Sequence, residues 1–195
     1  MKRNLALIVE GHGEVHALPV LLRRLIPHMP INLVGPPYRM KRSQMRDERS
    51  LTAAVEFAVG RTSDDDGVLI VLDADDDCAV TLGNEVLRHA RAAGRRRRVG
   101  VVVANREYEA WLVAGAPGLA GKRGLPPSLA APDDADALRN PKAWLAQRMP
   151  HGYRETLDQP ALSQSMDLVA ARKSRSFRKF VKEVTRLVRR EEKKR

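Results

Sequence analysis

The stretch Val68-Leu69-Ile70-Val71-Leu72-Asp73-Ala74-Asp75 decides the fold of this chain. Its apolar residues run without interruption, which predicts a strand that is buried on both faces and ends at the first aspartate. Similar runs at 5–9, 31–34 and 99–104 predict three more strands. Apolar residues at helical spacing lie between them, at about 14–26, 51–59 and 82–93. This alternation predicts an α/β fold with a mostly parallel, four-stranded sheet flanked by helices.

The chain has 195 residues, a length that suits one domain with a modest appendage. We predict an α/β domain at 1–114, a connection rich in glycine and proline at 115–140, and a helical, basic C-terminal region packed on the core at 141–195. Helices are predicted at 107–114, 141–149, 161–171 and about 177–188. Ser174 or Ser176 is expected to cap the last of them, and Asp158-Gln159-Pro160 to begin a turn.

Basic residues gather at the C-terminal end of the chain. The formal net charge is +11, and residues 171–195 alone hold 12 Lys/Arg against three Asp/Glu. A basic end on a nearly balanced body predicts an anionic partner, with nucleic acid ahead of a membrane surface. The alternative is a basic helix that only aids solubility. The side chains expected to contact nucleic acid are Arg106, Arg175, Arg178, Lys179, Lys182 and Arg186.

Several classes of protein are disfavoured by composition. The single cysteine, Cys78, excludes a disulfide framework and a cysteine-based zinc site, and it fits a reducing cytoplasm. No apolar run reaches the length of a membrane span, and the run at 5–9 is too short for a signal peptide. We therefore expect a cytoplasmic protein that does not enter a membrane.

Acidic side chains follow two of the predicted strands. Glu10 ends the first strand, with Glu14 four residues later, and Asp73 and Asp75 follow the strand at 68–72. Parallel strands in open α/β sheets place their carboxyl ends at one edge, where ligands bind. Carboxylates gathered there repel one another unless they hold protons or a cation, and oxygen ligands favour Mg²⁺, Mn²⁺ or Ca²⁺. Such an ion leaves positions open for phosphate oxygens and water.

Other interpretations of these residues are weaker. Gly11-His12-Gly13 opens like a dinucleotide-binding loop, but His16 occupies the third glycine position and the flanking glutamates would repel a pyrophosphate. A phosphoacceptor role for Asp73 would need a lysine near Ala104, and none is present there. Asp76 and Asp77 suit a solvated turn or a helix cap. Trp111 is expected to pack in the core and not to stack on a base.

The spacing of these acids resembles that of a known fold family. Glu10-Gly11 after a strand, followed about sixty residues later by Asp73-Ala-Asp75 after another, resembles the Toprim fold of topoisomerases, bacterial primases, recombination-repair proteins and overcoming-lysogenization-defect nucleases. Glu14 and Ala17-Leu18-Pro19 are most similar to the nuclease branch. Residues 105–112, 153–160 and 174–177 resemble stretches of uncharacterised bacterial Toprim-like proteins known only as a domain of unknown function.

The resemblance implies a phosphodiester site that depends on Mg²⁺ or Mn²⁺. Glu10 would be a metal ligand or general acid/base, Asp73 and Asp75 would be metal ligands, and Glu14 matches the second glutamate of the nuclease branch. If a second ion is used, Glu107 or Glu109 is the expected extra ligand, although both also suit a helix N-terminus. Arg106 is the basic residue in the most obvious place to stabilise a scissile phosphate.

The resemblance also implies partners. Relatives in the nuclease branch are commonly fused to an ATPase or work beside one, and this chain has no G-x-x-x-x-G-K-[ST] loop. A separate ATPase subunit, in phage defence, is therefore implied. Three functions remain open: a metal-dependent nuclease or related phosphoryl-transfer enzyme, a non-catalytic subunit of Toprim fold that binds nucleic acid or a partner, and a protein that binds a small phosphorylated ligand.

Overall fold

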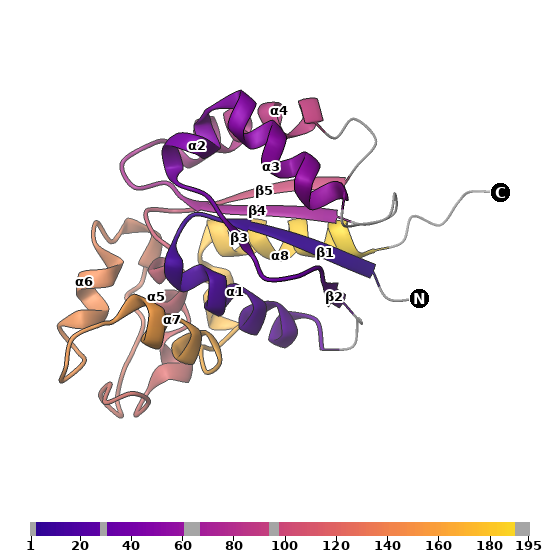
Figure 1. Ribbon diagram of the computed structural model, residues 1–195. Coiled ribbons are helices and arrows are strands. Elements are labelled where there is room, and N and C mark those ends of the chain that lie inside the picture. Colours follow the sequence, from indigo (N-terminus) through magenta and orange to yellow (C-terminus); the bar gives the residue numbers. More distant parts are fainter. Residues whose placement is uncertain (1–2, 28–30, 61–66, 94–97, 190–195) are drawn as a thin grey trace.

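The computed structural model of the protein describes residues 3–27, 31–60, 67–93 and 98–189. A five-stranded sheet lies at its centre in the order β2-β1-β4-β5, with β3 paired to the end of β1 (Figure 1). Every strand pair is parallel. The strands are β1 (Arg3–Val9), β2 (Ile31–Leu33), β3 (Tyr38–Arg39), β4 (Gly67–Asp73) and β5 (Arg98–Ala104).

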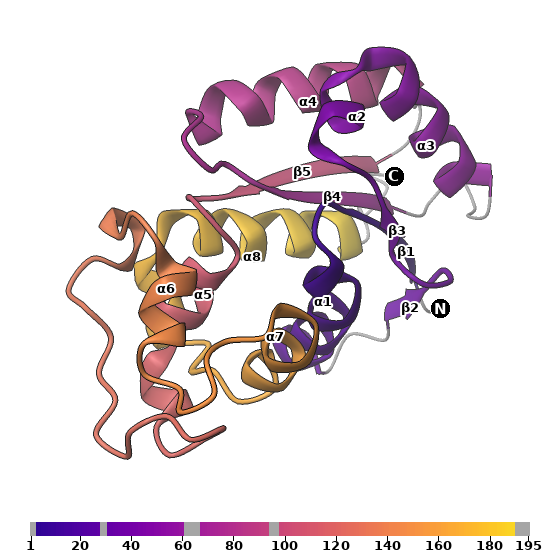
Figure 2. The same cartoon turned by 60° about the vertical axis from the view of Figure 1, so that its left-hand side comes forward.

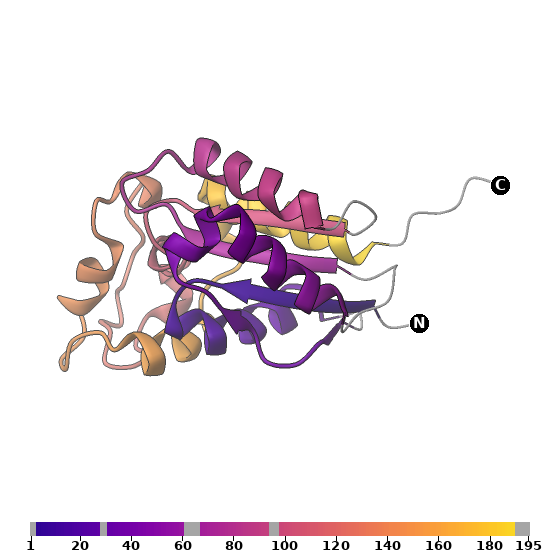
Figure 3. The same ribbon diagram turned by 45° about the horizontal axis from the view of Figure 1, so that its top comes forward.

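Helices cover both faces of the sheet. One face carries α2, α3 and α4, and the other carries α1 and α8, with α5, α6 and α7 gathered below the carboxyl ends of the strands (Figures 2 and 3). None of the helices in the described ranges is long and apolar enough to cross a bilayer. The helices are α1 (His12–Leu25), α2 (Arg42–Arg46), α3 (Glu48–Gly60), α4 (Ala79–Ala93), α5 (Glu109–Ala114), α6 (Pro141–Ala146), α7 (Glu155–Ser163) and α8 (Arg175–Val188), with short 3₁₀ turns at Ala116–Leu119, Ala135–Ala137 and Ala170–Lys173.

The α/β architecture with a mostly parallel sheet confirms the prediction, but the sheet has five strands and not four. The edge beside β1 is divided: β2 pairs with the first half of β1 and β3 with its end. Gly35, at φ 69°, and the two prolines after it separate the two short strands. Proline cannot donate to a strand ladder, so pairing stops and resumes around it. A strand of two residues shows no alternation, which is why the sequence did not predict β3.

The helix predicted at 161–171 is wrong. The chain instead forms α7 from Glu155 and a separate 3₁₀ turn at Ala170–Lys173. The turn predicted at Asp158-Gln159-Pro160 is also wrong, because these residues lie inside α7. Asp158 Oδ2 accepts the backbone N–H of Arg154 at 2.7 Å, which secures the start of the helix. Packing of α7 against α1 thus outweighs the local turn preference of the sequence.

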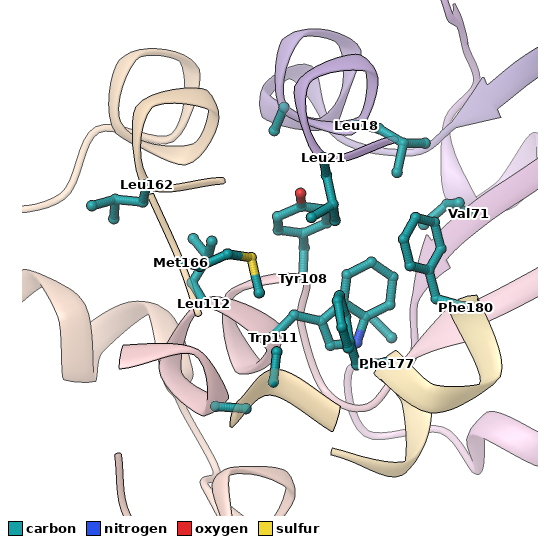
Figure 4. Close-up of a cluster of buried hydrophobic side chains, with 14 of the residues drawn as sticks. Leu18, Leu21, Val71, Tyr108, Trp111, Leu112, Leu162, Met166, Phe177 and Phe180 are labelled. Atoms are coloured by element: carbon teal, nitrogen blue, oxygen red, sulfur yellow. The ribbon is translucent and has the colours of Figure 1, made fainter. Parts of the chain in front are cut away.

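Aromatic side chains form the centre of the core on the α1 and α8 face (Figure 4). Trp111 of α5 lies 5.0 Å, centroid to centroid, from Tyr108 and from Phe180, and 5.7 Å from Phe177. Its indole N–H donates to Ser176 Oγ at 2.8 Å, so the one polar atom of the ring is satisfied. Trp111 is completely buried, as the sequence predicts.

Helix α8 runs antiparallel to β5 beneath the sheet. Ser174 caps its start and accepts the backbone N–H of Phe177 at 3.2 Å, which confirms one of the two predicted caps. Near the end of α8, Arg186 Nη2 donates to the backbone carbonyl of Val99 at 2.8 Å. Val99 is the second residue of β5. The helix therefore ends at the edge of the sheet opposite the carboxyl ends of the strands, as Figure 1 also shows. Residues 190–195 of the basic tail lie outside the described ranges.

Residues 115–140 lie against the same core as the sheet. Leu119, Leu125, Leu129 and Ala135 are all buried there. Asn105, directly after β5, donates to the carbonyl of Asp136 at 2.7 Å. The segment therefore adds apolar contacts that support the region below the strand ends.

Gly13 sets how closely α1 approaches α7. A Cβ atom at this position would lie 2.3 Å from Gln159 Oε1 and 2.7 Å from Glu155 Cγ, well inside van der Waals contact. The Gly13 backbone N–H donates to Glu155 Oε1 at 3.1 Å across the same contact. A glycine is therefore required where the N-terminus of α1 meets α7.

We expect Gly13→Ala to destabilise the protein by about 1–3 kcal/mol, because the added methyl group must displace the side chains of Gln159 and Glu155 on α7. Gly60→Ala is the matched control, since nothing lies within 4 Å of its Cβ position at the end of α3. We expect that variant to be neutral or slightly stabilising. Thermal unfolding followed by circular dichroism measures both, and equal midpoints would contradict the close approach of α1 and α7.

Candidate functional site

The carboxyl ends of β1 and β4 bring Glu10 and Asp73 together. The two strands pair in parallel with Val9 level with Val71, so both carboxylates reach the same edge of the sheet. Glu10 Oε2 accepts the backbone N–H of Asp73 at 3.2 Å. Asp73 Oδ1 in turn accepts the backbone N–H of Tyr108 at 2.8 Å. The structure thus joins two of the acidic residues that the sequence places at strand ends.

Two further acidic side chains, Glu14 and Glu109, are buried beside this pair. Glu14 lies in the first turn of α1, is 2% exposed, and accepts the backbone N–H of Gly11. Glu109 begins α5, is 1% exposed, and accepts a hydrogen bond from Gln159 Nε2 at 3.4 Å. The charges of both act on Asp73. We call Glu10, Glu14, Asp73 and Glu109 the carboxylate cluster.

Burial raises the pKa of every member of the carboxylate cluster above its ordinary value. For Glu14 and Asp73 the negative charges of neighbouring members add to this effect, and the pKa of Glu14 rises to about 8. Hydrogen bonding from Asp73 and the charge of Arg42 partly offset the rise in the pKa of Glu10. Burial and the neighbouring charges thus favour the protonated forms of these carboxyl groups over the charged forms.

Arg42, the first residue of α2, brings a positive charge to the carboxylate cluster. Its Nη1 lies 3.7 Å from Glu10 Oε2 and 3.2 Å from Asp75 Oδ2. The same guanidinium donates to the backbone carbonyls of Asp73 at 2.7 Å and Ala74 at 2.8 Å. Sequence analysis missed this residue, because α2 has five residues and gives no periodic pattern.

A second polar group comes from the C-terminal part of the chain and was also missed. Lys142 Nζ lies 3.2 Å from Glu155 Oε2 and 3.9 Å from Glu109 Oε1. Although burial opposes it, these carboxylates raise the pKa of Lys142, so the ammonium stays charged. Burial and the neighbouring Glu109 raise the pKa of Tyr153. The resemblance of residues 153–160 to uncharacterised proteins was the only signal for this stretch.

Three predicted site residues lie outside the carboxylate cluster. Asp75 is exposed, in a left-handed turn at φ 48°. Glu107 Oε2 accepts the backbone N–H of Lys142 at 3.0 Å, so it caps the start of α6. Arg106 Nη1 pairs with Asp76 Oδ1 at 2.6 Å. Two of these three contact the flanking cations of the site: Asp75 forms an ion pair with Arg42, and Glu107 accepts the backbone N–H of Lys142.

The basic side chains predicted to bind nucleic acid on α8 are mostly engaged within the chain. Lys179 and Arg186 both pair with Glu183. Arg178 donates to two backbone carbonyls of the preceding 3₁₀ turn. The helix also leads away from the carboxylate cluster toward the opposite edge of the sheet (Figure 1). The exposed members of the set are Arg175, Arg178, Lys179, Lys182 and Arg186.

A cavity of about 800 Å³ lies elsewhere, between α4 and α8 beside the edge strand β5. Its lining includes Val101 and Val103 of β5, Asn105 and Arg175. No member of the carboxylate cluster lines it. Because ionisable groups with strongly perturbed pKa values gather at functional sites, we place the candidate site at the carboxylate cluster.

The chain matches one family that is defined by sequence. The chain belongs to the family described as a domain of unknown function, DUF4276, whose model matches residues 9–185. This match includes every member of the carboxylate cluster, Arg42 and Lys142. No curated protein and no solved structure gives a significant match. The resemblance to the Toprim fold stays a prediction.

In the absence of divalent cations we expect the protein to lose stability as pH rises from about 4.5 to 8. Over this range the raised pKa of Glu14 lets the folded state bind a proton that the unfolded state has released. Glu14→Gln removes that charge, so its melting temperature should fall less as pH rises. Each kcal/mol of unfolding free energy that the variant retains at high pH corresponds to about 3 °C in melting temperature. Glu56→Gln, an exposed change on α3, is the control.

Melting temperatures measured in chelator at several pH values between 4.5 and 8.5 check this expectation. Identical pH profiles for the wild type and Glu14→Gln would show that burial of Glu14 does not couple folding to protonation.

Proposed function

We propose that the protein is a Mg²⁺- or Mn²⁺-dependent phosphodiester hydrolase that acts on nucleic acid. The observation that carries the proposal is the carboxylate cluster at the carboxyl ends of β1 and β4, where burial and then the charges of neighbouring carboxylates raise the pKa values of Glu14 and Asp73. A cation bound there would compensate the negative charges that burial makes unfavourable. The Toprim-like spacing of Glu10, Asp73 and Asp75 supports the same assignment.

The chemistry of the donor set fits a hard divalent cation. All members of the carboxylate cluster offer oxygen, which Mg²⁺ and Mn²⁺ prefer. Glu10, Glu14 and Asp73 each accept a backbone N–H through one oxygen. As the side chains lie, no three histidine, cysteine or acidic residues in the described ranges are arranged to hold one metal ion. Mg²⁺ commonly takes one or two carboxylates and completes its shell with water, so two ligands suffice.

Glu10 and Asp73 would hold the ion, with Asp75 at the open side and Glu14 beneath. When bound, such an ion polarises a phosphate and lowers the pKa of a coordinated water. The chain's own contribution is position and charge. Backbone N–H groups fix the orientation of Glu10 and Asp73, and Tyr108, whose N–H binds Asp73, is itself held in the aromatic core.

Two cations flank the carboxylate cluster and would face the charge of a phosphate. Arg42 reaches it from α2 and Lys142 from α6. These two helices lie on opposite sides of the sheet (Figure 2). Fixed positive groups aimed at developing negative charge are a major source of rate enhancement in phosphate chemistry. This pair fills the role that the sequence analysis gave to Arg106, which is paired with Asp76.

A second candidate function is a non-catalytic subunit that binds nucleic acid or a partner. The observation that favours it is Arg42 itself, whose guanidinium already pairs with Glu10 and Asp75. An arginine can neutralise acidic side chains without any metal. The separate ATPase partner and the role in phage defence remain proposals that rest on the resemblance alone.

For the hydrolase we expect Asp73→Asn to lower Mn²⁺-dependent plasmid nicking by about 100-fold or more, because it removes a carboxylate from the ion. Calorimetry should show weaker Mn²⁺ binding by the same variant. Asp133→Asn, an exposed change in the 115–140 segment, is the matched control and should behave as the wild type. Nicking activity that persists in the presence of a chelator and in the Asp73→Asn variant would contradict the proposal.

Arg42→Gln separates the two candidate functions. If the carboxylate cluster binds a metal, loss of the competing guanidinium should tighten Mn²⁺ binding about 3- to 10-fold, while nicking falls about 100-fold because a phosphate contact is lost. If Arg42 replaces the metal, the wild type binds no Mn²⁺ and has no nicking activity to lose. Calorimetry and the nicking assay on the same samples distinguish these results.

A further inference from the structure

Two exposed aromatic rings lie against each other near the candidate site. Tyr38 of β3 is 46% exposed and Phe57 of α3 is 56% exposed. Their ring centroids are 5.9 Å apart with the planes inclined at 49°. The large aromatic rings of the core, such as Trp111, are by contrast completely buried. Exposed aromatic rings are the groups on which unpaired bases stack in proteins that bind single-stranded nucleic acid.

Two cations follow Tyr38 directly in the sequence. Arg39 and Lys41 are both exposed. Neither forms an ion pair with another residue of the described ranges. Arg46, one helical turn farther on, is by contrast held by Asp77 and Glu85. The charges of Arg39 and Lys41 are therefore available to an anionic ligand.

This surface leads to the carboxylate cluster. Tyr38 pairs with Ile8 and Arg39 with Val9, so β3 ends beside Glu10. At about 3.3 Å per residue, Tyr38 lies roughly 7 Å along the strand from the level of Glu10. The charge of Arg39 acts on Glu10, which agrees with this placement. Successive strand residues point to opposite faces of a sheet, so Tyr38 lies on the face of Ile8 and Arg39 on the face of Val9, at the outer edge of the sheet that β3 forms. We call the set Tyr38, Arg39, Lys41 and Phe57 at this edge the β3 surface.

We propose that the β3 surface binds single-stranded nucleic acid and leads it to the carboxylate cluster. This inference rests on the proposed function, and it names the form of the substrate. Arg39 and Lys41 would contact backbone phosphates, and Tyr38, supported by Phe57, would stack on a base. Cations beside exposed aromatic rings are the usual arrangement in proteins that bind single strands.

The aromatic pair favours a single strand over a duplex. In a duplex the faces of the bases are stacked on one another and are closed to a side chain, whereas an unpaired base can stack on a ring. A surface for duplex DNA would need only charge. The β3 surface also replaces α8 as the expected contact, because it lies at the carboxylate edge and its cations are unpaired within the described chain.

The test is fluorescence anisotropy of a labelled 20-nucleotide strand and of its duplex, both in chelator so that no cleavage occurs. We expect the wild type to bind the single strand at least 10-fold more tightly. Tyr38→Ala should weaken that binding about 10-fold, as expected for loss of one stacked base, without changing its salt dependence. Phe57→Ala should weaken it less.

Arg39→Ala combined with Lys41→Ala should act on the salt dependence instead. Loss of two phosphate contacts should reduce the slope of log K against log salt by about 1.4 for a single strand. Arg178→Ala combined with Lys182→Ala, which removes the same charge from α8, is the matched control and should leave the slope unchanged. All four changed positions are exposed, and circular dichroism checks that each variant is folded.

Equal affinity for strand and duplex would overturn the inference, and so would loss of the salt slope in the α8 variant alone.

Asp73→Asn separates this inference from the proposed function. If that variant and the wild type bind the strand equally but neither nicks DNA, the β3 surface stands and the hydrolase proposal fails. The opposite result is a wild type that cleaves DNA and a Tyr38→Ala variant whose strand binding and cleavage both equal those of the wild type. In that case the inference about the β3 surface fails and the hydrolase proposal stands.

Discussion

Parallel pairing of β1 with β4 places Glu10 and Asp73 at one edge of the sheet, and the burial of carboxyl groups at this edge governs the rest of the site. Burial of Glu14 and Glu109 beside them raises the pKa values of the carboxyl groups. Several carboxylates in a low-dielectric site are costly unless protons or cations compensate them. The surrounding elements supply partial compensation through backbone N–H groups and the two flanking cations.

The net charge of +11 has a different meaning once the chain is folded. The described part of the basic C-terminal helix lies along β5, and its charges are largely engaged with Glu183 and backbone carbonyls. Positive charge beside the carboxylate cluster comes from Arg42 of α2 and Lys142 of α6. The charge of Arg39 on β3 also acts on Glu10. Attraction of a polyanion and binding of a cation are therefore combined at one edge of the sheet.

The sequence predicted the parts of this protein that depend on local pattern. Buried strands show as apolar runs, and parallel pairing then implies that Glu10 and Asp73 meet, as they do. It did not predict Arg42 or Lys142, because their positions depend on tertiary packing of short elements that have no periodicity. The sequence also did not predict that Pro160 lies inside a helix, because α7 depends on its packing against α1.

The central claim is that the carboxylate cluster is a cation site. A crystal structure of the protein grown with Mn²⁺, analysed by anomalous diffraction, tests it most directly. The account predicts an anomalous peak bound by carboxylate oxygens of Glu10 and Asp73, at about 2.2 Å as is usual for small divalent cations. Carboxyl groups that remain paired with Arg42, with no ion between them at millimolar Mn²⁺, would contradict it.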